Sequence, residues 1–240
     1  ESDKNVLVLD AEVSNSTSAE KVKEKTPQQF IECFIAEQNM IGMALGLSKK
    51  CFNVYASTFA AFLSRAHDQL RMAALSNANV TISGSHAGVS IGEDGPSQMG
   101  LEDIALFRTL PTSTILYPAD AVSCEKITAE CKNISGIKYI RTTRPKTPVI
   151  YSMKEEFPIG EYKIIQSSLK DQLILVGAGI TLHESLQAYA ALKKEEISAA
   201  VIDVYCIKPF NEKKFLDFVE KHDKKIIIAE DHYKEGGIGE

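Results

Sequence analysis

The chain has 240 residues, of which 44% are hydrophobic and 25% are charged, as in an ordinary globular protein of one or two domains. A formal net charge of −5 gives no reason to expect nucleic acid or an anionic membrane as a partner, and no apolar run reaches the roughly 18 residues that a membrane span needs. The five cysteines are scattered without a CxxC pair, which argues against a disulfide framework or zinc site and favours a reducing compartment such as the cytoplasm.

Short apolar runs alternate with segments of helical spacing over the first 145 residues, after an N-terminus that resembles neither a signal peptide nor a transit peptide. The predicted strands are Asn5–Leu9, Phe30–Cys33, Asn53–Ser57, Val80–Gly84, Ser113–Tyr117 and Ile137–Thr142. The predicted helices are Glu37–Lys49, Phe62–Asn77 (with Phe62, Ala66, Leu70 and Ala73 on one face), Leu101–Thr109 and Ala121–Lys132. Because the strand runs are apolar throughout, this order predicts a parallel sheet with helices on both faces.

The segment Thr143–Tyr162 interrupts this rhythm with three prolines and a charged patch. We assign 146–161 to a linker between domains at 1–145 and 162–240. After the linker the predicted elements are the strands Leu173–Val176, Ala199–Tyr205 and Lys225–Ala229 and the helices Thr181–Lys194 and Glu212–His222. We therefore expect two α/β domains, each a mostly parallel sheet with helices on both faces. The second is expected to be incomplete, because the final GGIGE is a turn that should lead into another element.

The densest signal is the segment Gly84–Met99, which holds four glycines, His86, Glu93, Asp94 and Gln98. A strand that ends at its first residue would bring this long loop to the carboxyl edge of the sheet, where open α/β sheets bind ligands. Long loops without regular structure are often functional, and these side chains can hydrogen-bond a polyhydroxylated molecule. The alternative is an ordinary surface loop with a solvated acidic pair.

Glu37 opens a predicted helix directly after a strand. One interpretation is a first-turn carboxylate that the helix dipole stabilises. The other is a buried acid whose raised pKa suits proton exchange.

Two further pairs also allow two interpretations. Phe59 and Phe62 share a helix face, so they belong either to the core or to a flat slot for an aromatic ring. Arg141 and Arg144 end a strand, where they can clamp a phosphate or remain solvated.

The turn Gly177–Gly179 lies between a strand and a helix, as in dinucleotide-binding folds. The third glycine of that motif is absent, and the acidic partner has only a loose candidate in Asp203. We therefore do not expect a nicotinamide or flavin cofactor.

Several long motifs, in order, resemble transketolase in the form found in animals. They are LDAEVSNST, FIECFIAEQNM, STFAAFLSRAHDQLRMAAL, GSHAGVSIGEDGPSQMGLEDIALFRT, YPADAVS, YIRTTRP, VGAGITLHES and IAEDHYKEGGIGE. The resemblance covers nearly the whole chain. It implies a pyrimidine-binding (Pyr) domain at 1–145 followed by a transketolase C-terminal domain.

The resemblance implies thiamine diphosphate as cofactor, bound at the interface of a homodimer. The Pyr domain binds the aminopyrimidine ring, and the partner's N-terminal domain, absent here, binds the diphosphate through Mg²⁺ or Ca²⁺. Glu37 resembles the glutamate that bonds the 1′ nitrogen of the ring and favours its imino tautomer. Phe59 and Phe62 resemble walls of the ring pocket, and Glu12 stands where the family has an aspartate near the cofactor.

The same resemblance assigns residues to sugar phosphates. His86 and Asp94 resemble groups that bind hydroxyls at the reacting end, with His86 also expected to take part in catalysis. Ser16 and Arg144 resemble ligands of the phosphate, and Gln98 resembles a residue that reaches towards both cofactor and sugar.

The implied reaction transfers a two-carbon ketol unit from a ketose phosphate to an aldose phosphate, as in the pentose phosphate pathway. Two departures matter: Glu12 is one methylene longer than the usual aspartate, and the diphosphate-binding domain and a second phosphate-binding arginine are missing. We therefore expect the chain to be inactive alone. The alternatives are a non-catalytic or split-subunit homologue, or another Pyr-domain enzyme (1-deoxyxylulose-5-phosphate synthase or a 2-oxo acid dehydrogenase beta subunit).

Overall fold

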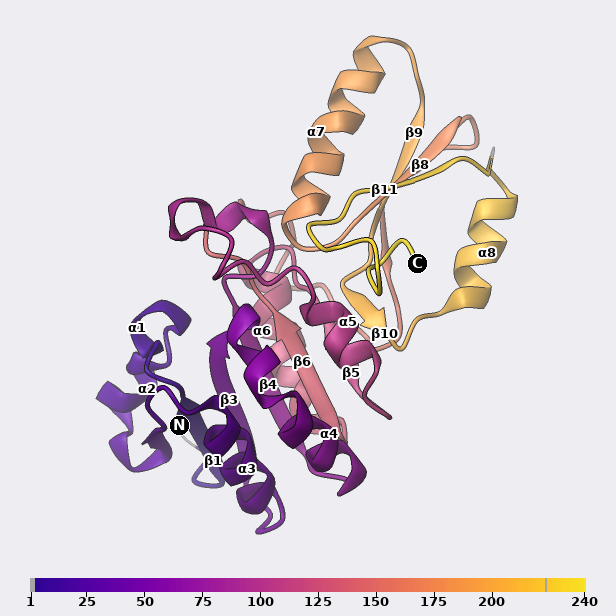
Figure 1. Cartoon of the computed structure of the whole chain (residues 1–240). Coiled ribbons are helices and arrows are strands. Elements are labelled where there is room, and N and C mark those ends of the chain that lie inside the picture. Colours follow the sequence, from indigo (N-terminus) through magenta and orange to yellow (C-terminus); the bar gives the residue numbers. More distant parts are fainter. Residues whose placement is uncertain (1–2, 223) are drawn as a thin grey trace.

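The computed structural model describes residues 3–222 and 224–240, which form two sheets, one centred in each part of the chain (Figure 1). The larger sheet has the strand order β10-β5-β6-β4-β3-β1-β2, and the smaller has the order β11-β8-β9-β7. The predicted α/β architecture with two mostly parallel sheets is confirmed. Among the described residues, no helix is both long and apolar enough to cross a bilayer.

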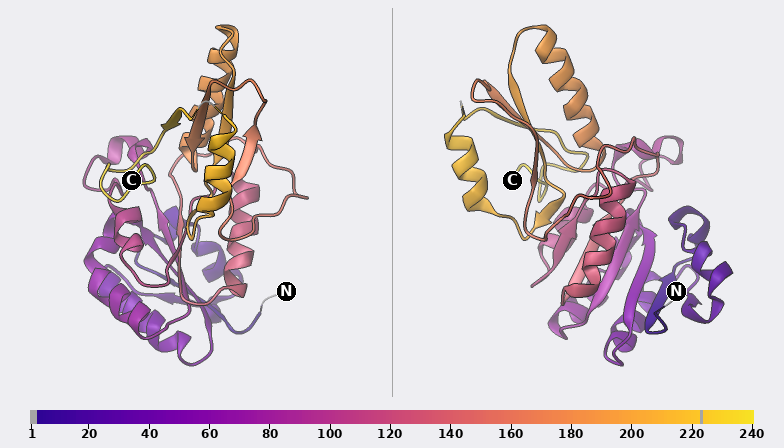
Figure 2. Two further views of the ribbon diagram at one scale, coloured as in Figure 1. Left: turned by 90° about the vertical axis from the view of Figure 1, so that its right-hand side faces the viewer. Right: turned by 180° about the vertical axis from the view of Figure 1, so that it is seen from behind.

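The first sheet is parallel except at β10. Its strands from the N-terminal part are β1 (Val6–Asp10), β2 (Phe30–Glu32), β3 (Asn53–Phe59), β4 (Val80–Ser85), β5 (Thr114–Leu116) and β6 (Ile137–Arg141). The connecting helices are α1 (Ser14–Thr17), α2 (Glu20–Lys25), α3 (Glu37–Ser48), α4 (His67–Leu75), α5 (Asp103–Arg108) and α6 (Ala121–Glu130). Helices α3, α4 and α5 cover one face and α6 covers the other (Figures 1 and 2).

Parallel pairing brings the carboxyl ends of β1, β2, β3, β4 and β6 to one edge of this sheet. The chain leaves that edge through five segments that carry the sequence-predicted site residues. The central strands are buried: every residue of β6 is buried, and β4 is buried at five of its six positions. The edge is therefore a rigid platform for its loops.

The second sheet is built by the C-terminal part. Its elements are β7 (Lys163–Gln166), β8 (Leu173–Gly177), α7 (Ile180–Lys194), β9 (Ala199–Asp203), α8 (Glu212–Glu220) and β11 (Ile226–Ile228). β7 pairs antiparallel with β9, whereas the other pairs are parallel. Helices α7 and α8 lie on opposite faces of this sheet (Figure 1).

Strand β10 (Cys206–Lys208), which was not predicted, follows β9 in the chain but pairs antiparallel with β5 at the edge of the first sheet. The prediction extended the preceding strand to Tyr205, but β9 ends at Asp203. A three-residue strand before a proline gives too little periodicity to be recognised. The C-terminal part therefore completes the sheet of the N-terminal part.

The predicted linker contains no helix or strand, yet it is tightly packed. Tyr151 and Phe157 are buried at 6% and 2% exposure, and their rings meet edge to face with centroids 4.9 Å apart. They join a core cluster that includes Leu116 and Ile140 from the first sheet and Val201 from the second. This shared core joins the two parts of the chain.

The helix predicted over Phe62–Asn77 is only partly correct. Ala60–Ala66 forms a 3₁₀ segment, η2, and the α-helix begins at His67. Ala66, Leu70 and Ala73 are buried as expected, but Phe62 is not. A 3₁₀ segment turns through three residues rather than 3.6, so Phe62 does not share the buried face of α4. Three further 3₁₀ segments are η1 (Pro27–Gln29), η3 (Val89–Asp94) and η4 (Cys131–Asn133).

Candidate functional site

Glu37 is the first residue of α3 and is only 3% exposed. The chain reaches it from β2 through Phe34, which adopts a left-handed conformation with φ of 55°. Its carboxylate accepts a hydrogen bond at 2.5 Å from the guanidinium of Arg65. Glu37 is thus both a first-turn acid and a buried one, and it does not point into open water.

Arg65, which sequence reasoning missed, joins the acid to the aromatic residues. It lies on η2, its side chain is half exposed, and its guanidinium stacks over the Phe62 ring at 4.5 Å from the centroid. An arginine three residues after Phe62 has no distinguishing sequence signal, because the same spacing is found on any solvated helix face. Only the path of η2 brings it to the carboxylate.

The aromatic residues continue from Phe62 to the glycine-rich loop. The Phe59 and Phe62 rings stack with centroids 5.3 Å apart, and Phe59 stacks with the His86 imidazole at 4.0 Å. Phe59 and His86 are buried, whereas Phe62 is half buried. Together with Arg65 and Glu37, these residues form a continuous group, here called the Glu37–His86 cluster.

His86 is held in an unusual backbone conformation, with φ of 57°. Its Nδ1 lies 2.7 Å from the Ser85 hydroxyl. Burial lowers the pKa of His86 and the charge of Arg144 lowers it further, whereas Asp94 opposes both effects. The imidazole is therefore mainly neutral near pH 7, with one nitrogen able to donate and the other to accept.

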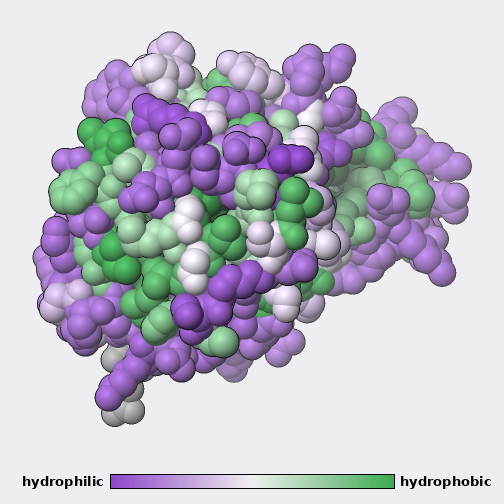
Figure 3. Space-filling view, turned by 60° about the horizontal axis from the view of Figure 1, so that its bottom comes forward, coloured by the Kyte–Doolittle hydropathy of each residue, from purple (hydrophilic) through white to green (hydrophobic). Residues whose placement is uncertain are grey.

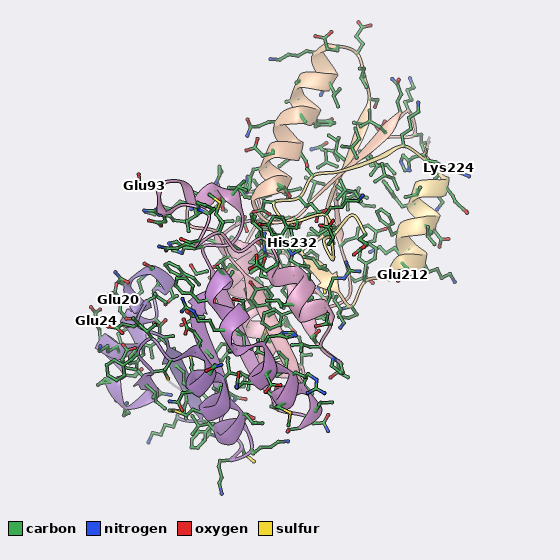
Figure 4. The ribbon with its side chains drawn as sticks, in the orientation of Figure 1. Glu20, Glu24, Glu93, Glu212, Lys224 and His232 are labelled. Carbon is green, nitrogen blue, oxygen red and sulfur yellow. The ribbon has the colours of Figure 1, made fainter. Side chains whose placement is uncertain are left out.

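Arg144 and Asp94 are brought together by the same loop. One guanidinium nitrogen, Nη1, donates at 2.9 Å to both the Asp94 carboxylate and the Ile91 carbonyl. The other, Nη2, lies 3.5 Å from Glu93, whose side chain projects outward from η3 (Figure 4). Arg144 is 38% exposed, so its charge remains accessible to a further anion.

A cleft of about 400 Å³ opens beside the cluster. Its lining includes Phe62, Arg65, the end of the glycine-rich loop and Tyr233. This space lies next to the one flat aromatic surface of the cluster that remains partly exposed.

Three predicted residues lie outside the cluster. Glu12 is exposed with φ of 61°, and its backbone N–H donates to Glu32. Ser16 is exposed on α1, where its hydroxyl donates to the side chain of its neighbour Asn15. Gln98 is half buried, and among the described residues no hydrogen bond joins its side chain to the cluster. All three follow carboxyl ends of strands, but the structure does not connect them to Glu37.

The acid that organises the segment after β1 is Asp10. It is fully buried and accepts hydrogen bonds from Ser57, Thr17 and the Val13 N–H at 2.6, 2.6 and 2.7 Å. Burial raises the pKa of Asp10, although these hydrogen bonds oppose the effect. Within the described ranges, no group of three or more His, Cys, Asp or Glu side chains could hold a metal ion.

Comparison with known proteins supports the resemblance seen in the sequence. Residues 1–149 match the family model described as transketolase, pyrimidine binding domain, and residues 160–240 match transketolase, C-terminal domain. Human transketolase is 50% identical over 98% of this chain, and bovine transketolase-like protein 1 is 51% identical over the same share. The chain spans only 38% and 40% of these two relatives.

Two solved structures have the same fold. A split gene transketolase, described as an inactive beta4 tetramer, matches with a TM-score of 0.88 and 33% identity, over 99% of this chain and 77% of that one. The Pichia stipitis transketolase in complex with sedoheptulose 7-phosphate matches with a TM-score of 0.78 and 22% identity, over 88% and 34% of the two chains. The predicted resemblance is thereby confirmed.

Proposed function

Because the chain belongs to the transketolase family, we propose that it carries the aminopyrimidine-activating half of a thiamine diphosphate site. The enzyme would transfer a two-carbon ketol unit from a ketose phosphate to an aldose phosphate in the pentose phosphate pathway. When bound, the cofactor supplies an electron sink for the two-carbon fragment. The observation that carries this proposal is a buried carboxylate, Glu37, linked through Arg65 to stacked aromatic rings.

The residues present fit the ring half of the cofactor. Glu37 is withdrawn from bulk water, so a hydrogen bond between its carboxyl group and a ring nitrogen would be strengthened by the low local dielectric. The partly exposed face of Phe62 borders the cleft and is suited to stack on a flat heterocycle, with Phe59 behind it. Glu12 and Gln98 are proposed to approach the same ring from neighbouring loops.

The diphosphate half requires another domain. We propose that Mg²⁺ or Ca²⁺ holds the diphosphate on a region beyond these 240 residues, because the chain spans 38% of its human relative. Residues 1–145 would form the Pyr domain and 162–240 the C-terminal domain, with 146–161 joining them. The chain alone would then not turn over substrate.

Sugar phosphates are the proposed substrates. His86 is mainly neutral and buried beside Phe59, so it can orient a substrate hydroxyl and exchange a proton with it. Asp94 would bind hydroxyls, while Arg144 and Ser16 would bind the phosphate. The Arg144–Asp94 pair at 2.9 Å keeps these two groups in place before substrate arrives.

A homodimer in a cytoplasmic enzyme, with the cofactor at the subunit interface, is the proposed assembly. Phe34 and Ile35, just before Glu37, are 65% and 74% exposed. On another face, apolar side chains gather between polar ones (Figure 3), and α4 exposes Met72 and Leu75. Exposed apolar groups favour burial against another subunit or domain, and Phe34 and Ile35 lie next to the half-built site.

A naturally split enzyme is the second candidate. It is favoured by the match to a split gene transketolase chain, of which this chain covers 77%. The coding sequence on both sides distinguishes the two: an upstream metal-binding motif in the same reading frame indicates one long enzyme, and a separate partner gene indicates a split one.

The proposal is tested by combining this chain with the missing domain, covalently or as a second subunit, and measuring turnover of xylulose 5-phosphate with ribose 5-phosphate. Ketol transfer that needs thiamine diphosphate and Mg²⁺ supports it. Consumption of pyruvate, or no transfer in the assembled protein, overturns it. In calorimetry with Mg²⁺, the chain alone should bind the cofactor only weakly, with a dissociation constant well above about 1 μM (~8 kcal/mol).

A further inference from the structure

A buried group of charges joins the C-terminal segment to the edge of the first sheet. Arg141, at the end of β6, is fully buried between Asp103 of α5 and Asp231, which follows β11. Its Nε donates to Asp103 at 2.8 Å and its Nη1 donates to Asp231 at 2.6 Å. The Tyr117 hydroxyl also donates to Asp231, at 3.0 Å.

This group is costly to bury, which indicates a role other than stability. Replacing a buried ion triad with apolar residues is often neutral or stabilising, because three charges lose their hydration. Here, Asp103 also keeps one carboxylate oxygen without a hydrogen-bond partner among the described residues. The contacts of Arg141 with Asp103 and Asp231 instead fix the position at which Asp231 meets the sheet.

That place is the turn just after His86. Gly88 has φ of 77°, and a Cβ built on it would overlap the Asp231 carboxylate. The Gly88 N–H donates at 2.8 Å to the Gly100 carbonyl, which also accepts from Arg141 at 3.1 Å. The Asp231 carboxylate thus occupies the space that any side chain at position 88 would need.

Two further contacts fix both sides of this junction. The Ala87 N–H donates to the Thr142 carbonyl, directly after Arg141, at 3.0 Å. On the other side, His232 accepts at 3.3 Å from the Ala105 N–H and lies where the C-terminal segment meets the helix α5 (Figure 4). The C-terminal segment therefore cannot shift without moving the turn at Ala87 and Gly88.

We propose that Asp231 is a positioning residue for His86: through Gly88 and Arg141, the C-terminal domain holds the imidazole against Phe59 for substrate binding. This rests on the proposed function, because the consequence concerns a sugar-phosphate site. The stacking distance of 4.0 Å and the positive φ of His86 leave its ring little freedom as long as the turn is held.

The first test uses the 240-residue chain and needs no activity. In Asp231→Ala, amide hydrogen exchange at Ala87 and Gly88 should accelerate by about tenfold or more, while amides of α3 stay unchanged. The matched control is Asp217→Ala, which replaces an exposed aspartate on α8. It should leave exchange at Ala87 and Gly88, and in α3, unchanged. Unchanged exchange at Gly88 in folded Asp231→Ala overturns the proposal.

The second test uses the assembled enzyme. Asp231→Ala should raise KM for the ketose phosphate about fivefold or more, with unchanged affinity for thiamine diphosphate. An unchanged KM, or an equal loss of cofactor affinity, overturns the positioning role. If the unsubstituted assembled enzyme shows no ketol transfer, the proposed function fails, and the exchange test still decides whether Asp231 holds the turn.

If Asp231→Ala unfolds, hydrogen exchange becomes equally fast in α3, and Gly88→Ala then serves as the second variant. It retains both Arg141 and Asp231, so no buried charge loses its partner residue. It should raise the same KM, because the new methyl meets the Asp231 carboxylate. In the double variant Gly88→Ala/Asp231→Ala this clash is removed. The rise in KM should therefore be smaller than the two single variants would give together. Full additivity, or a normal KM in Gly88→Ala, contradicts the proposal.

Discussion

The guanidinium of Arg65 lies 2.5 Å from the carboxylate of Glu37 and at the same time stacks over the Phe62 ring. A single side chain thus joins the buried acid to the aromatic surface that borders the cleft. The acid is 3% exposed, whereas its partner is half exposed. The charge of Glu37 is therefore balanced by a partly exposed side chain, which also lines the cleft.

Arg65→Met should reduce the free energy of unfolding by about 1 kcal/mol, because Arg65 is half exposed and solvent screens its interaction with Glu37. The double variant Glu37→Gln/Arg65→Met should lose less than the sum of the two single variants, because the neutral amide needs no cation. Urea unfolding of the four proteins measures this coupling. Strictly additive losses would show that the two side chains do not interact in solution.

Much of this site could be predicted from the sequence, because the patterns that mark it lie between residues close together in the chain. Glu37 follows a strand and opens a helix, and the loop after Gly84 concentrates glycines with polar side chains. These patterns place residues at the carboxyl edge of a parallel sheet without knowledge of packing. The edge positions of His86, Asp94 and Arg144 follow from the same argument.

What could not be predicted depends on contacts between distant segments. Arg65 reaches Glu37 only because η2 is a 3₁₀ segment rather than the first turns of a helix. Asp231 meets Gly88 across 143 positions of sequence, and β10, from the C-terminal part of the chain, pairs with β5 in the sheet of the N-terminal part. No periodicity or spacing in one sequence records such contacts.

Arg144→Lys should raise KM for the ketose phosphate about tenfold (~1.4 kcal/mol) with little change in kcat, because lysine lacks the planar fork that binds a phosphate bidentately. Steady-state kinetics of the assembled enzyme measures this. Arg71→Lys on α4, in an exposed pair with Asp68, is the matched control and should behave like the unsubstituted enzyme. A normal KM for Arg144→Lys would remove Arg144 from the phosphate site.

Asp203 should make stability depend on pH between about 4 and 7. Burial raises its pKa to about 7, although the Tyr151 hydroxyl donates to it at 2.5 Å. The folded state therefore holds this proton more tightly than the unfolded chain, in which an aspartate has a pKa of ~3.9. The contribution to stability is fully present below that unfolded value and is lost as pH rises through about 7. Asp203→Asn should flatten this part of the stability profile.

Asp171 is the control for Asp203, because its pKa is shifted in the opposite direction. Burial alone would raise the pKa of Asp171, but hydrogen bonds from Ser168 and Ser198 lower it. Its contribution is therefore present above the unfolded value and is lost as pH falls through the lowered pKa. Asp171→Asn should weaken the acid limb and leave the loss between pH 4 and 7 in place. If stability falls equally between about pH 4 and 7 in Asp203→Asn and in the unsubstituted chain, Asp203 is not the group responsible.

The most direct test of the central claim is the rate of ketol transfer from xylulose 5-phosphate to ribose 5-phosphate by Glu37→Gln in the assembled enzyme. We predict a loss of roughly 100-fold or more, because glutamine cannot share a proton with the ring nitrogen. Thermal unfolding should remain close to that of the unsubstituted enzyme, and the exposed control Glu125→Gln should keep full activity. Near-normal turnover by folded Glu37→Gln would contradict the account.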